Sequence, residues 1–152
     1  MTIEKGITAK LEDWFAATLA ALTYEGEAVF KTAEAWVHQF EAGAESFVRF
    51  APFAFVSYWP ADPTREGDYD LCQILRFSIL IGVTSSAAGV ARRGDAHNVG
   101  ASKIRDLVIA ALDGSNPGGT YKVDDFDFTG ETELVDKPKL YATELHFACS
   151  FV

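Results

Sequence analysis

Hydrophobic and polar residues alternate most clearly along residues 71–83 and 139–152, and this period of two predicts two β-strands. In the first strand the apolar positions face one side, whereas Arg76 and Ser78 face the other. The second strand presents one expected core face, made of Tyr141, Thr143, Leu145, Phe147, Cys149 and Phe151. We expect this strand in the middle of a sheet beside the first, with His146 exposed on its more polar face.

Two segments instead repeat their apolar residues every three or four positions, which predicts amphipathic helices over residues 2–22 and 102–113. Ser102 is the expected N-cap of the second helix, and Gly114 is the expected residue that ends it. A further helix over residues 38–50 fits the same spacing. Helices of this kind bury their apolar stripe against a sheet.

The remaining segments predict shorter strands. Residues 28–36 and 49–58 alternate well enough to be strands, and a polar loop over residues 61–70 should make the second an antiparallel neighbour of the strand at 71–83. Residues 121–128 and 132–136 are expected to form a hairpin around a tight turn at Gly130. Helices and strands together indicate one α+β domain spanning residues 1–152.

Composition and charge then narrow the classes of partner. The 152 residues are 49% hydrophobic, enough for a buried core, and carry a formal charge of −9. A charge of this sign repels phosphate backbones and anionic lipid, so we expect no partner among free nucleic acids or membranes. The same charge can also serve solubility alone. No segment approaches the roughly 20 apolar residues of a membrane helix, and the first residues lack a secretory pattern, which favours the cytoplasm.

Candidate chemistry is sparse. We expect Cys72 and Cys149 to be reduced thiols, because they fall on opposite faces of their strands. Asp124, Asp125 and Asp127 lack the glycine and closing glutamate of a calcium loop, so a solvated strand face is the better interpretation. No metal, cofactor or catalytic motif is predicted.

Residues 84–100 form the longest stretch without hydrophobic periodicity, and long loops of this kind are usually functional or disordered. Asp95 and His97 suggest an acid–base pair, yet no nucleophile can be placed beside them from sequence. Arg92 and Arg93 are instead an adjacent cationic pair that could hold carboxylates of a neighbouring subunit. The loop is therefore a candidate interface.

The order and spacing of several segments resemble a known family. These segments are the N-terminal helix, the aromatic strand with Pro52, the strand LRFSILIGV, the helix ending at Gly114, the segment FTGETELVD from Phe128 to Asp136 and the closing strand LYATELHFACSFV. Together they resemble the tail terminator, or tail completion, family of Mu-like contractile-tailed phages and prophages. The resemblance covers nearly the whole chain, and it transfers no active-site residue.

The resemblance implies an α+β fold with helices packed on a mixed, mostly antiparallel sheet. It also implies a non-enzymatic protein without cofactor that forms a homo-oligomer, expected to be a hexameric ring. Such a ring would cap the tail tube protein, offer a surface to head-tail connector proteins, and occur in the bacterial host cytoplasm and then in the virion tail. The expected interface residues are Arg92, Arg93, Asp95, Gly130 and Glu131.

Two alternatives remain open at this point. One is a different phage neck or tail assembly component, or an adaptor that does not close into a ring. The other is a small α+β ligand-binding domain or enzyme, with a pocket that combines Asp95 and His97 with the aromatic strand at 53–59.

Overall fold

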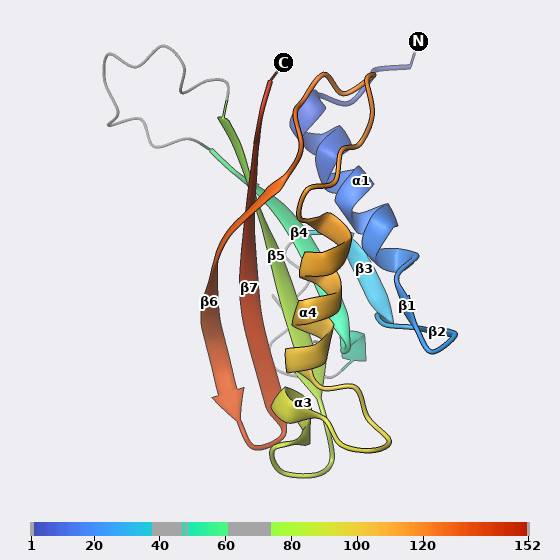
Figure 1. Cartoon of the computed structure of the whole chain (residues 1–152), viewed down its shortest axis with the longest axis vertical. Coiled ribbons are helices and arrows are strands. Elements are labelled where there is room, and N and C mark those ends of the chain that lie inside the picture. The colour runs from blue at the N-terminus through green and yellow to red at the C-terminus, as the bar shows by residue number, and fades with distance from the viewer. Residues whose placement is uncertain (1, 38–46, 48, 61–73, 152) are drawn as a thin grey trace.

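A computed structural model describes residues 2–37, 47, 49–60 and 74–151 of the chain (Figure 1). Its main sheet has five strands in the order β3-β4-β5-β7-β6. Strand β3 runs parallel to β4, and each of the other neighbouring pairs is antiparallel. The bounds of these strands are Thr32–Ala35 for β3, Phe53–Trp59 for β4, Ile74–Thr84 for β5, Asp127–Lys137 for β6 and Leu140–Ser150 for β7. The fold is thus α+β with a mixed sheet, as expected.

Helices cover one face of this sheet (Figure 1). They are α1 (Ile7–Ala20), the single turn α3 (Val90–Arg93) and α4 (Ala101–Leu112). Phe15 of α1 is fully buried, and its ring centroid lies 5.1 Å from that of Phe77 and 4.4 Å from that of Phe126. Phe147 of β7 completes this aromatic centre. The apolar stripe of the helices and the apolar face of β5 and β7 therefore form one core.

The central strands confirm the alternating pattern. Leu75, Phe77, Ile79, Ile81 and Val83 of β5 are buried beneath the helices. Strand β7 lies between β5 and β6, in the predicted position, and its inward side chains from Tyr141 to Cys149 are buried. Phe151, which was also expected on this core face, lies beyond the end of β7 and is exposed. Cys149 is a free thiol, whereas Cys72 lies outside the described residues. Burial raises the pKa of the Cys149 thiol to about 12, so it is uncharged at neutral pH.

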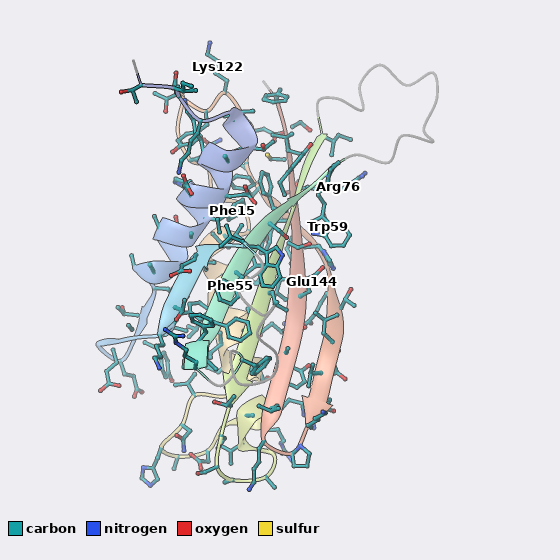
Figure 2. All side chains as sticks on the ribbon, turned by 180° about the vertical axis from the view of Figure 1, so that it is seen from behind. Phe15, Phe55, Trp59, Arg76, Lys122 and Glu144 are labelled. Carbon is teal, nitrogen blue, oxygen red and sulfur yellow. The ribbon has the colours of Figure 1, made fainter. Side chains whose placement is uncertain are left out.

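The opposite face of the sheet carries apolar side chains in one region and polar side chains in another (Figure 2). Phe53 and Phe55 are buried there in a second apolar cluster, separate from the core under the helices. Farther along the face lies His146, which was expected to be exposed. The structure corrects this expectation: His146 is half-buried, and its two ring nitrogens each lie 3.1 Å from a hydroxyl oxygen, those of Ser78 and Thr132.

The helix expected over residues 2–22 is shorter in the structure, because Gly6 has an extended backbone and α1 begins at Ile7. The single strand expected over residues 28–36 is wrong. Glu27–Ala28 (β2) instead forms a small antiparallel ladder with Thr23–Tyr24 (β1), and β3 begins only at Thr32. Between them Val29 and Phe30 are both buried, so the alternation is broken.

Strand β4 is antiparallel to β5, as predicted, although the 61–70 loop that motivated this prediction lies outside the described residues. Most of the helix expected over residues 38–50 is also outside them; Phe47, Arg49 and Phe50 are helical. The aperiodic stretch 84–100 is not entirely loop, because it contains α3.

The expected N-cap Ser102 is wrong, since Gly100 occupies that position and α4 begins at Ala101. Gly100 lies so close to the backbone of Arg93 and Gly94 that a Cβ atom would overlap it. This close approach fixes the entry of the chain into α4. At the other end Gly114 has φ +76°, a conformation that favours glycine, and so ends the helix as expected.

The hairpin expected at Gly130 is also wrong. Gly130 lies within the continuous strand β6, which pairs with β7 along its length. The register shifts between Phe128 and Gly130, so the extra residue is accommodated as a β-bulge and no turn is needed. The actual hairpin joins β6 to β7 through Pro138 and Lys139. The segment before Asp127 contributes only an isolated bridge between Val123 and Phe151.

Candidate functional site

A cleft of about 240 Å³ lies where α3, the first turns of α4, β6 and β7 meet. Its charged lining residues are Arg92, Arg93, Arg105 and Glu131. Tyr141 and Thr143 of β7 form its floor on the core side of the sheet. The structure therefore gathers Arg92, Arg93 and Glu131, three of the five predicted interface residues, although they are nearly forty positions apart in sequence.

Glu131 is held in place by two donors. The Nε atom of Arg105 donates to one of its carboxylate oxygens at 2.6 Å, and the Thr143 hydroxyl donates to the other at 2.8 Å. The hydrogen bond and charge of Glu131 raise the pKa of Arg105, which stays a cation. Arg105 also contacts Asp106 at 3.1 Å. Both oxygens of Glu131 are thus occupied within the cleft.

Arg92 and Arg93 differ from Arg105. Both are exposed, and no hydrogen bond or ion pair of either side chain occurs within the described part of the chain. Arg92 also borders a neighbouring hollow beside Asp136 and Lys137 at the end of β6. Arg93 borders the next hollow along the loop. These two guanidinium groups keep their donors available for a ligand.

Asp95 lies in that next hollow, of about 460 Å³, together with His97 and Lys103. One oxygen of its carboxylate accepts the main-chain N–H groups of His97 and Asn98, each at 2.8 Å. These hydrogen bonds hold the pKa of Asp95 below its usual range. The carboxylate therefore orders the loop before α4. The imidazole of His97 is not bonded to it, so the acid–base pair suggested by the sequence is not formed.

The predicted pocket that joined Asp95 and His97 to the aromatic strand is not present in the described structure. The hollow around His97 is lined by residues of the β1–β2 turn, the loop 93–100 and α4, with none from β4. Phe53 and Phe55 are instead buried on the opposite face of the sheet. The two halves of the supposed pocket are on different sides of the molecule.

Gly130, like Asp95, is a predicted interface residue that does not line the cleft. Its partner in the ladder is His146, whose side chain lies on the face opposite the helices. The neighbouring Glu131 points toward α4 and the cleft. Gly130 directly follows Thr129, the extra residue of the bulge that shifts the register of β6.

Sequence reasoning missed the side chains that complete the cleft. Tyr141 and Thr143 were assigned to the core face, where their hydroxyl groups are unusual and could have indicated polar partners. Those partners are Glu133, which accepts the Tyr141 hydroxyl at 2.8 Å, and Glu131. Burial, followed by the Glu133 carboxylate, raises the pKa of Tyr141 to about 12. Glu131 and Glu133 of β6 are therefore bonded to side chains of β7, whereas Arg92 and Arg93 of α3 form no hydrogen bond or ion pair within the described residues.

No ion-ligating cluster of three histidine, cysteine or acidic side chains exists within the described ranges. Among those same residues no helix is long and apolar enough to cross a membrane. Comparison of the chain with protein-family models, curated proteins and solved structures gives no match.

Proposed function

We propose that this chain is a tail terminator of a Mu-like phage or prophage. Its subunits would assemble into a closed ring that caps the tail tube, ends its growth and presents a surface to the connector proteins of the head. A closed ring needs contacts between two different patches on each subunit. The function is binding, without a cofactor or a chemical step.

The observation that carries the proposal is the pair of exposed guanidinium groups, Arg92 and Arg93, beside a cleft in a chain of net charge −9. Unpaired arginines favour recognition of carboxylates, and a self-associating acidic protein supplies these in every copy. The α+β fold with helices on a mixed sheet agrees with the architecture that the resemblance implies. The order and spacing of the resembling segments supply the specific family.

The test is the absolute mass of the purified protein, measured by light scattering over a range of concentrations and salt, with electron microscopy of any large species. The expected result is a closed ring of about six copies. A second assay adds the protein to polymerising tail tube subunits and measures tube length. Shorter tubes with protein at one end support the proposal, whereas monomers that neither assemble nor bind tubes contradict it. A monomer that binds the tube without capping it would favour an adaptor.

The double variant Arg92→Glu with Arg93→Glu tests the residues. We expect weaker self-association with an unchanged unfolding transition, because both side chains are exposed and outside the core. The double variant Lys5→Glu with Lys10→Glu is a matched control. It changes the net charge equally, and its side chains pair with Asp13 and Glu4 away from the cleft. Unchanged oligomer mass in the arginine variant would remove these residues from the interface.

A further inference from the structure

The cleft beside α3 is lined by more positive than negative side chains. Three arginines line it against one glutamate, and that glutamate has both oxygens bonded to Arg105 and Thr143. Arg92 and Arg93 face this space of roughly 240 Å³, and neither forms an ion pair with a carboxylate of the described residues, although Asp136 borders a neighbouring hollow with Arg92. Such a space fits an acidic segment that can place two carboxylates against two guanidinium groups.

A segment of this chemistry occurs in every copy of the chain. Residues 124–127 carry Asp124, Asp125 and Asp127, all exposed, around the buried Phe126. One oxygen of Asp124 accepts the main-chain N–H of Ser150 at 2.6 Å, which ties the segment to the end of β7. Asp125 accepts a side-chain N–H of Asn116 at 3.1 Å. The acidic segment is thus an ordered surface feature, with carboxylate oxygens left for a partner.

The segment cannot reach Arg92 within its own subunit. Asp127 begins β6, whereas Arg92 lies beside Asp136, nine residues farther along the strand. At about 3.3 Å per residue this separation is about 30 Å. The loop that precedes β6 and the helix α3 lie toward opposite ends of the molecule (Figure 1). Any pairing between the acidic segment and Arg92 therefore joins different subunits.

We infer that the cleft beside α3 binds the acidic segment 124–127 of a second copy of this chain. The contact is heterologous, because the two patches differ and every subunit carries both. Heterologous contacts of this kind repeat from subunit to subunit, and they close into a ring when the rotation allows. The inference deepens the proposed function and rests on it, since it names the two surfaces by which the ring would form.

The test is a charge exchange between the two patches. One variant carries Arg92→Glu with Arg93→Glu, and the other carries Asp125→Lys with Asp127→Lys. Asp124 is left unchanged because it anchors the main chain of Ser150. Each variant alone should assemble at least about tenfold more weakly than the native protein, because like charges then meet at the contact. An equimolar mixture should regain the native mass, since each reversed patch now meets its complement.

Light scattering gives the masses, and circular dichroism confirms that both variants are folded. The Lys5→Glu, Lys10→Glu variant controls for the net charge of the arginine variant. The pairing is supported if the native mass is recovered in the mixture but not in either variant by itself. The pairing is overturned if the two folded variants form native rings separately, or if they fail to recover the native mass when mixed. In either case a ring formed by the native protein leaves the terminator proposal intact. If the native protein forms no oligomer and binds no tube, both proposals fail.

Discussion

Strands β6 and β7 are neighbours of equal length, eleven residues each, yet their side chains differ in burial. Strand β7 alternates buried and half-buried residues in the centre of the sheet, whereas β6 is mostly exposed at its edge and has two register shifts. The buried strand is specified by its own hydrophobic pattern. The edge strand is specified by its partner, because β7 supplies the ladder hydrogen bonds that β6 follows.

The largest expected contrast between the two strands is a truncation in the core. Phe147→Ala on β7 removes a fully buried ring that contacts Phe15 and Phe128, and should lower the free energy of unfolding by about 3–5 kcal/mol. Leu134→Ala on β6, where half of the side chain is exposed, should cost less than about 1 kcal/mol. Urea unfolding followed by circular dichroism measures both. Equal losses would contradict the division between centre and edge.

Glycines give the second contrast. Gly82 of β5 lies directly under the Phe53 ring, and a Cβ atom there would overlap it. Because Phe53 is buried in a packed cluster, Gly82→Ala should destabilise the protein by about 1–3 kcal/mol. Gly130 of β6 has nothing within 4 Å of a Cβ position. Gly130→Ala should therefore change the stability by no more than about 0.5 kcal/mol, measured in the same unfolding experiment.

The hydrogen bond between Tyr141 of β7 and Glu133 of β6 can be followed through the titration of Tyr141. Tyr141 has a pKa raised to about 12 by burial and by Glu133, so its neutral form is favoured in the folded protein. The stabilisation is complete below the unfolded-state pKa of about 10, and is lost as the pH rises from there through about 12.

Spectrophotometric titration of tyrosinate should therefore show one late-titrating group that disappears in Tyr141→Phe. Glu133→Gln removes the carboxylate that accepts the Tyr141 hydroxyl, and should move this titration to lower pH. A late titration that survives Tyr141→Phe would assign the group to another tyrosine.

A small effect is also expected at the cleft. The bond between Arg105 and Glu131 joins partly exposed side chains, with 36% and 27% of their surfaces accessible. Surface pairs of this kind contribute about 0.2–1 kcal/mol. Arg105→Ala and Glu131→Gln should each lower the stability by an amount in that range, and a double-mutant cycle isolates the pair. A coupling near zero would show that the pair only orients the cleft.

The sequence predicted those elements whose own residues determine them. β5, β7 and α4 were found from their periodicity, because each buries one stripe of side chains against the core. Gly130 was misread as a turn, since a glycine in a bulged edge strand and a glycine in a hairpin have similar neighbours. Ser102 was misread as a cap because the decisive contact, between Gly100 and Gly94, comes from the fold of the preceding loop.

The candidate site was predictable only in part. Arg92 and Arg93 stand out as an adjacent cationic pair, and Glu131 was named for a different reason, its expected turn. Their meeting in one cleft depends on α3 packing beside the β6–β7 hairpin, where the main-chain N–H of Gly89 donates to the Pro138 carbonyl at 2.6 Å. A contact between segments so far apart leaves no periodic signal in either of them.

The place of β7 between β5 and β6 also has a consequence for the time course of folding. β6 and β7 are joined by a two-residue turn and can pair locally, but β5 pairs with β7 across a long separation, from Thr84 with Leu140 to Ile74 with Ser150. Closing that loop costs chain entropy before any contact is gained, which slows folding. We expect the β6–β7 hairpin to form early and the β5–β7 register to form late. The middle of the sheet, the best-buried part of the finished protein, would then be the last part to assemble.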